Sequence, residues 1–125
     1  MRRSGVVAML VVLLVVGGAT AAFAHISFLD IDTFQGPSLD QLRAEGTIDC
    51  TQGETFLIKV SASMPDFKAL ARANGTCTGS YQQWVTNVAR TFGTLEDGPC
   101  LVRVEARTSD GDRKVLKIHT TCSTN

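Results

Sequence analysis

Hydrophobic and polar residues alternate over most of the chain after its first two dozen residues. In the segment 55–62, Phe56, Ile58 and Val60 would lie on one side of an extended strand, and the segment 101–107 alternates in the same way. Alternation with a period of two is typical of strands that bury one face. Turn-forming sequences separate these segments at 51–54, 64–66, 74–75, 96–99 and 110–112.

The pattern predicts an all-β fold of seven strands. The expected strands cover residues 26–34, 42–50, 54–62, 67–74, 80–90, 100–108 and 113–121. About seven short antiparallel strands in roughly 100 residues are typical of an immunoglobulin-like β-sandwich. Residues 38–45 can also be interpreted as one helical turn that begins at Ser38.

The four cysteines are placed symmetrically about two of the turns. Cys100 and Cys122 are equally distant from the centre of the last turn, and Cys50 and Cys77 are equally distant from a point beside the turn at 64–66. A hairpin at each turn would bring each pair face to face, which predicts disulfides Cys50–Cys77 and Cys100–Cys122. Disulfides of this kind persist outside the cytosol.

The two hairpins also predict which side chains lie opposite each other. Pairing Cys100 with Cys122 sets Glu105 opposite Lys117, which is a favourable pair of opposite charges. The other hairpin sets Lys59 opposite Lys68. Because like charges directly opposite each other are unfavourable, a bulge or a different register stays open at that place.

The first 24 residues have the three parts of a secretory signal peptide. Arg2 and Arg3 are basic, residues 6–16 are almost wholly apolar, and the residues at 22–24 form a cleavage site of the A-x-A type. The apolar run is shorter than the about 20 residues that span a bilayer, and an uncleaved N-terminal anchor is the alternative. Cleavage would leave residues 25–125 as one domain, which we expect to be secreted to the extracellular space.

Composition gives little indication of a charged partner. The chain has 12 Lys and Arg residues and 12 Asp and Glu residues, and removal of the signal peptide would leave a net charge of about −2. This balance gives no sign of binding to nucleic acid or to anionic lipid. We therefore expect the partner to be a protein, a glycan or a small ligand, and we expect no stable membrane span after cleavage.

Three segments carry a resemblance to a known family. They are GTIDCTQGETF at 46–56, GTCTG at 75–79 and QWVTNV at 83–88. Together with the expected strand at 100–107, they resemble an uncharacterised family of small secreted proteins of high-GC Gram-positive bacteria. The resemblance implies an immunoglobulin-like fold with two disulfides and export from a bacterial cell, and it supplies no active site. Neocarzinostatin-type carriers are a weaker match, because their cysteines enclose short loops.

His25 is the sharpest chemical lead in the sequence. If cleavage follows Ala24, the free α-amine and the imidazole of His25 can chelate Cu(II), an ion that favours nitrogen ligands. His119, on the outward face of the last expected strand, could complete the site if the first strand lies near it. The alternative is that both histidines are ordinary surface residues. A secreted copper-binding protein is therefore the second hypothesis.

No motif in the sequence predicts an enzyme. Neither histidine lies in a nucleophile motif, and the cysteine spacing fits no zinc site. Asp30 with Asp32, and the turn at 110–112, could offer oxygens to Ca²⁺, but both lack the run of ligands of an EF-hand loop. Trp84 could stack on a sugar, although its strand position favours the core. The leading hypothesis is a secreted, non-enzymatic domain without a cofactor, for binding or for cell-envelope structure.

Overall fold

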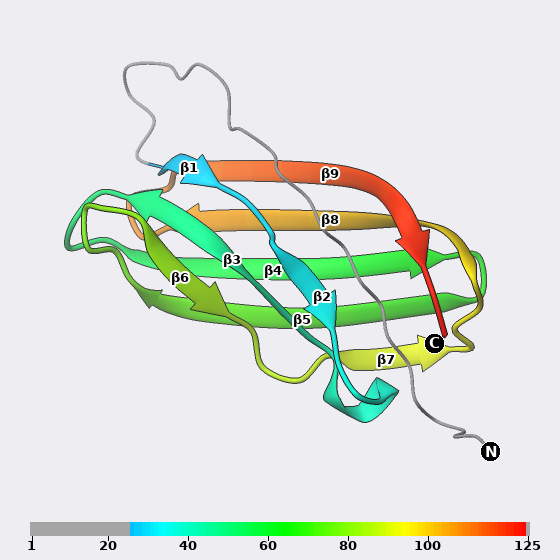
Figure 1. Ribbon diagram of the computed structural model, residues 1–125. Coiled ribbons are helices and arrows are strands. Elements are labelled where there is room, and N and C mark those ends of the chain that lie inside the picture. Colours follow the sequence, from blue (N-terminus) through cyan, green and yellow to red (C-terminus); the bar gives the residue numbers. More distant parts are fainter. Residues whose placement is uncertain (1–25, 125) are drawn as a thin grey trace.

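The alternating segments form the strands of an all-β sandwich with two antiparallel sheets (Figure 1). The computed structural model describes residues 26–124. In one sheet, β3 (Arg43–Cys50) pairs along one edge with β1 (Ile26–Leu29) and β2 (Thr33–Gln35). Its other edge pairs with β6 (Gln82–Val85). This sheet is called the β3 sheet below.

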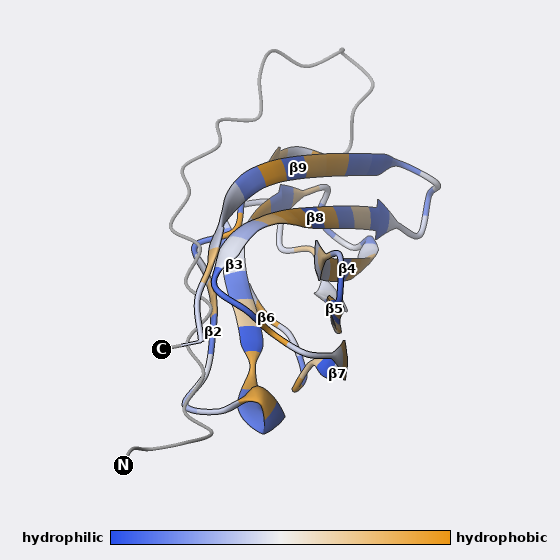
Figure 2. Ribbon diagram, turned by 90° about the vertical axis from the view of Figure 1, so that its right-hand side faces the viewer, coloured by the Kyte–Doolittle hydropathy of each residue, from blue (hydrophilic) through white to orange (hydrophobic). Residues whose placement is uncertain are grey.

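The second sheet has five strands in the order β7-β5-β4-β8-β9. They are β4 (Thr55–Met64), β5 (Phe67–Thr76), β7 (Arg90–Gly93), β8 (Gly98–Thr108) and β9 (Arg113–Cys122). The predicted inward faces are confirmed, because Ile58 and Val60 of β4 and Val102 and Val104 of β8 are fully buried. Figure 2 shows hydrophobic and hydrophilic residues alternating along β8 and β9. The sandwich therefore follows from strands that each bury one face.

Nine strands form within residues 26–124 where seven were expected, because two of the expected strands are each divided. The segment 26–34 forms β1 and β2, which are joined by a link that keeps contact with β3 through two backbone hydrogen bonds. In these, the Asp30 N–H donates to the Thr47 carbonyl (3.0 Å) and the Asp32 N–H donates to the Glu45 carbonyl (2.8 Å). The chain therefore runs beside β3 throughout but leaves the regular ladder at the link.

The segment 80–90 is divided between the two sheets. The Thr86 N–H donates to the Ala44 carbonyl of β3 (2.9 Å), whereas the Asn87 N–H donates to the Arg72 carbonyl of β5 (2.9 Å). The Ala89 N–H then donates to the Leu42 carbonyl (2.8 Å), just before β3, so the chain contacts both sheets between β6 and β7. The helical turn considered at 38–45 is wrong in extent, because η1 (Leu39–Gln41) is a 3₁₀ turn that leads directly into β3.

The expected register of the last hairpin is wrong by two residues. Cys100 lies opposite Thr120, and Glu105 lies opposite Val115 rather than Lys117. The hairpin is centred on residue 110, whereas the midpoint between the two cysteines is residue 111. An even shift keeps the same residues on each face, and so the inward side of β8 is unchanged.

The hairpin of β4 and β5 is shifted by four residues from the expected register. A two-residue turn closes it, with Met64 opposite Phe67, and Lys59 therefore lies opposite Arg72 rather than Lys68. Symmetry about the cysteines misplaced this hairpin because the turn, and not the disulfide, sets its register.

Both predicted disulfides are present, but they join different kinds of neighbours. Cys100 and Cys122 are diagonal neighbours on β8 and β9, with Cα atoms 5.8 Å apart. Cys50 ends β3, and Cys77 follows β5, so this disulfide links the two sheets; its Cα atoms are 5.4 Å apart. The prediction that both disulfides join hairpin partners is therefore wrong for Cys50–Cys77.

Candidate functional site

The copper site predicted at His25 and His119 stays a prediction. His25 lies outside the described residues. The Ile26 N–H donates to Oδ2 of Asp112 (2.9 Å), just before β9. His119 is exposed near the opposite end of this strand. Seven residues of strand separate Asp112 from His119, or roughly 20 Å, so Ile26 and His119 are far apart.

The aspartates considered for Ca²⁺ have roles in the fold. Asp30 is buried, and its Oδ1 accepts the Thr47 N–H (2.7 Å). Burial raises the pKa of Asp30, with a further contribution from the nearby charge of Asp32. Oδ1 of Asp110 accepts the Thr108 hydroxyl within the last hairpin turn. No group of three or more His, Cys, Asp or Glu residues within 26–124 is placed to hold a metal ion.

Trp84 belongs to the core. It is 2% exposed, and no hydrogen-bond partner is present for its Nε1 among the described residues. Gly46 lies directly opposite it on β3, and a Cβ atom added to Gly46 would come within 2.7 Å of the indole. Trp84 is therefore not available on the surface for stacking on a sugar.

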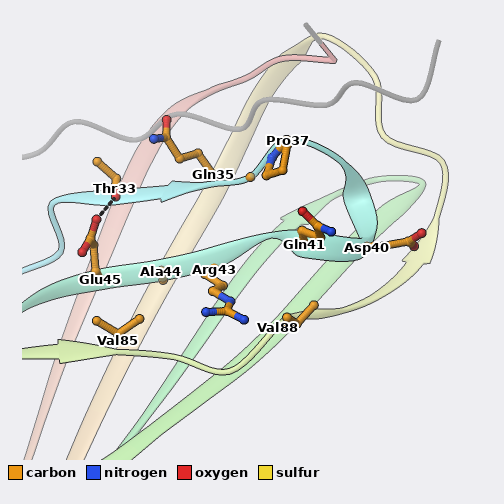
Figure 3. A pocket seen from close by; sticks show the side chains of 11 residues that line it. Thr33, Gln35, Pro37, Asp40, Gln41, Arg43, Ala44, Glu45, Val85 and Val88 are labelled. Atoms are coloured by element: carbon orange, nitrogen blue, oxygen red, sulfur yellow. Dashed lines mark hydrogen bonds between the residues drawn. The ribbon is translucent and has the colours of Figure 1, made fainter. Parts of the chain in front are cut away.

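A groove of about 1000 Å³ lies on the outer face of the β3 sheet (Figure 3). We call it the β3 groove, and its lining includes Thr33, Gln35, Gln41, Arg43, Glu45 and Val85. Glu45 is held on both sides, because its carboxylate accepts the Thr33 hydroxyl (3.3 Å) and the amide N–H of Gln83 (3.0 Å). Val85 is 51% exposed and supplies an apolar part of the lining.

The backbone of Gly36 allows η1 to close one end of this groove. A Cβ atom at Gly36 would lie 2.3 Å from the carbonyl oxygen of Gln41, which is closer than atoms can approach. The short turn that begins after β2 therefore depends on glycine at this position.

An aromatic pair lies farther along the same outer face. The rings of Phe28 and Tyr81 meet edge to face, with centroids 5.1 Å apart and planes at 82°. Phe28 is on β1 and Tyr81 directly precedes β6, so the two rings come from opposite sides of β3. Tyr81 is 67% exposed. The pair lies roughly 13 Å from the near edge of the β3 groove, because four residues of β3 separate Glu45 from Asp49, the partner of Phe28.

The outer face of the five-stranded sheet is strongly basic. Eight of the ten lysines and arginines in residues 26–124 lie at its outward positions. They are Lys59, Lys68, Arg72, Arg90, Arg103, Arg107, Arg113 and Lys117. Glu105 is the one acidic side chain among the described outward positions of this sheet. We call this surface the basic face.

Glu105 lies at the centre of a cluster of three arginines. Its carboxylate accepts Nη1–H of Arg103 (3.1 Å), Nε–H of Arg107 (2.9 Å) and Nε–H of Arg113 (2.8 Å). Although it is on an outward face, Glu105 is only 7% exposed. The hydrogen bond from Arg107, aided by Arg103 and Arg113, lowers the pKa of Glu105 to about 2 against the opposing effect of burial. The cluster therefore carries a net positive charge at neutral pH.

The basic face could have been predicted from the charges along each strand, although the net charge of the chain gives no sign of it. In β8, Arg103, Glu105 and Arg107 alternate with buried residues, and Lys59 has the same outward position on β4. Summing charges over the whole chain cancels these cations against acidic residues in loops and on the other sheet. Summing them by strand face would have found the basic face without any knowledge of register, since an even shift leaves the faces unchanged.

The chain has no detected relative that would assign a function to either surface. Comparison with models of protein families, with curated proteins and with solved structures finds no match. The family resemblance of the sequence therefore stays a prediction. Within residues 26–124, no helix is long and apolar enough to cross a membrane.

Proposed function

We propose that the protein is an exported, non-enzymatic binding domain that holds an extended glycan segment on the outer face of its β3 sheet. The observation that carries this proposal is the combination, on one face, of the β3 groove and the aromatic pair Phe28–Tyr81. Binding sites for small and extended ligands are concave, with an apolar part and a few placed polar groups. Both features are present here.

The chemistry of the face suits a ligand that is polar but uncharged. Glu45 already accepts two hydrogen bonds, and the other charged groups of the lining, Arg43 and Asp40, have opposite charges. The side-chain amides of Gln35 and Gln41 can each donate and accept hydrogen bonds, as sugar hydroxyls can. The exposed ring of Tyr81 offers an apolar surface to the C–H face of a sugar ring. The groove and the aromatic pair together span roughly 20 Å along β3, from Arg43 to Asp49, which would accommodate several sugar units.

Two further features support an exported binding domain. Two disulfides are usual in small domains that leave the reducing cytosol. The pairing of β3 with β6 in one sheet, and the order β4-β8-β9 in the other, are compatible with an immunoglobulin-like order of strands. Such a domain would act as a binding module or a structural part of the cell envelope. The separation of Ile26 from His119 weighs against the copper alternative.

The test uses two exposed aromatic residues on opposite sheets. Tyr81→Ala removes a ring from the proposed site, whereas Phe92→Ala removes a 51% exposed ring from the other sheet. We expect Tyr81→Ala to weaken binding of soluble cell-wall oligosaccharides by about tenfold or more, as loss of a central aromatic contact does. Phe92→Ala should leave the affinity unchanged. Isothermal titration calorimetry on the disulfide-intact domain measures both.

Two results would contradict the proposal. Equal affinities of the wild type and the Tyr81→Ala variant would mean that the outer face of the β3 sheet is not the glycan site. Release of shortened sugar products by the purified domain would show that it is an enzyme.

A further inference from the structure

We propose that the basic face binds a linear polyanion with repeated phosphate groups. This second site is on the opposite sheet from the proposed glycan site, and it does not depend on that site. The primary observation is charge segregation, because eight cations and a single carboxylate share one outer face. Adjacent strands are about 4.8 Å apart, so neighbouring cations lie within the Debye length of about 10 Å and reinforce one another.

Two depressions divide the basic face into separate places for anionic groups. The first, of about 530 Å³, is lined by Arg103, Arg113, Val115 and Lys117. The second, of about 310 Å³, is lined mainly by Lys59, Lys68, Leu70, Arg72 and Arg103. Arg103 borders both depressions. One lies over β8 and β9 and the other over β4 and β5, so about two strand spacings, or roughly 10 Å, separate them.

This arrangement favours a chain of anions over an isolated ion. Each depression is bordered by at least three cations, and the short distance between them can be crossed by a flexible polymer whose charges repeat every few ångströms. A ligand that fills both places gains from the second contact without a second loss of translational freedom. An isolated phosphate ion would occupy one depression and gain no such advantage.

Glu105 positions the arginines for phosphate recognition. Its hydrogen bonds with Arg107 and Arg113 use the Nε–H groups, so the terminal amino groups of both guanidinium forks are not used in these bonds. Arginine recognises phosphate through paired hydrogen bonds from its planar fork. A central carboxylate also reduces the repulsion that would otherwise push the three guanidinium groups apart.

The surface fits this occupant better than a nucleic acid or a membrane. Single-stranded nucleic acids need aromatic platforms for their bases, and Phe92 is the one Phe, Tyr or Trp among the described outward positions of this sheet. Membrane-bound surfaces combine cations with several apolar side chains that enter the lipid. Among the described outward positions of this sheet, the exposed large hydrophobic side chains are two, Leu70 on β5 and Phe92 on β7, both near one edge of the sheet.

The test compares two double variants with the same change in net charge. Lys59→Gln/Lys117→Gln removes one cation from each depression of the basic face. Arg43→Gln/Lys114→Gln removes the two described cations that lie elsewhere. With fluorescently labelled inorganic polyphosphate as the probe, we expect the first variant to bind at least about tenfold more weakly, on the scale of two lost phosphate contacts. The second variant should bind like the wild type.

Salt and alternative probes complete the test. We expect wild-type affinity for polyphosphate to fall steeply between about 50 and 200 mM salt, and less steeply in the Lys59→Gln/Lys117→Gln variant. Equal losses in both variants would overturn the proposal, because net charge and not the basic face would then determine binding. Tighter binding to duplex DNA, or to vesicles of equal parts phosphatidylcholine and phosphatidylglycerol, would overturn the assigned class of ligand. Thermal melting confirms that both variants are folded.

Discussion

Glu105 is an acidic residue that is buried on an otherwise solvent-facing surface. Its burial is possible because three guanidinium groups surround the carboxylate and satisfy its oxygens. Removing the carboxylate's charge would leave three arginines close together with no acidic partner at the described outward positions of the sheet. The residue therefore links the stability of the sheet to the electrostatics of the basic face.

The charge of Glu105 predicts a specific loss of stability in acid. Its pKa is lowered from the usual 4.5 to about 2 in the folded protein, so the stabilisation is fully present above about pH 4.5 and is lost as the pH falls toward 2. We expect Glu105→Gln to lower the free energy of unfolding at pH 7 by about 1–3 kcal/mol, a range that allows for solvent screening at the partly exposed arginines. Urea denaturation at pH 7 and near pH 2 measures the difference.

An exposed glutamate supplies the matched control. Glu96→Gln makes the same chemical change in an exposed loop, and we expect it to change stability by less than about 0.5 kcal/mol. The difference between the Glu105→Gln variant and the wild type should shrink near pH 2, where the native carboxyl is also becoming neutral. A difference that stays constant over this pH range would show that the packing of Glu105, and not its charge, is responsible.

At the scale of elements, β3 holds its sheet together through a close approach at Gly46. A Cβ atom at this position would lie 2.2 Å from the Asp30 carbonyl oxygen and 2.7 Å from the ring of Trp84. Both the link between β1 and β2 and the indole of Trp84 on β6 must therefore pack against a residue without a side chain.

We expect Gly46→Ala to destabilise the protein by about 1–3 kcal/mol, because the extra methyl group overfills a packed site. Thr47→Ala is the control, since its side chain is on the outward face and its backbone N–H can still donate to Asp30. It should cost less than about 0.5 kcal/mol. Urea denaturation gives both values, and a Gly46→Ala variant as stable as wild type would mean that the link at Asp30 moves freely.

The strand faces could be predicted from the sequence, whereas the register could not. Burial alternates along β4 and β8 as the hydrophobic pattern indicates. The register errors were shifts of two and four residues, and even shifts leave every side chain on its own face. The hydrophobic pattern therefore contains no information that could have detected them. The positions of Cys50 and Cys77 predicted the wrong register, because their disulfide joins the two sheets and not the two strands of a hairpin.

The sequence also did not predict that the segment 80–90 is divided between the two sheets. No glycine or proline lies between β6 and β7, where the chain contacts both sheets, and Thr86 is itself buried. Long-range hydrogen bonds to β3 and β5 determine where this chain segment changes sheets. Such bonds depend on which strands are neighbours, and local sequence does not specify that. The same limit applies to the β3 groove, which combines β2, η1, β3 and the end of β6.

At the scale of the whole molecule, the fold separates charges that the sequence mixes. Cations gather on the outer face of the five-stranded sheet, while Glu45 and Asp49 of β3 lie on the outer face of the other sheet. The protein therefore presents two chemically different faces, a basic one and one with polar and aromatic side chains. If both proposals hold, one domain contacts a charged polymer and a neutral glycan on opposite faces.

The two disulfides also act on the whole molecule, and they predict different consequences of reduction. Their sequence separations are 27 and 22 residues, so chain entropy alone gives each a similar contribution, about 3–4 kcal/mol. Cys50–Cys77 additionally ties the two sheets together, whereas Cys100–Cys122 reinforces two strands that are already paired.

We therefore expect Cys50→Ala/Cys77→Ala to cost at least as much stability as Cys100→Ala/Cys122→Ala, each within about 2–5 kcal/mol. Amide hydrogen exchange should show the difference in location. Loss of Cys50–Cys77 should increase exchange along β3 while β4 and β8 stay protected, because the β3 sheet can then open separately from the five-stranded sheet. Loss of Cys100–Cys122 should affect mainly the paired ends of β8 and β9. If both double variants melt at the wild-type temperature, packing between the sheets maintains the fold without either crosslink.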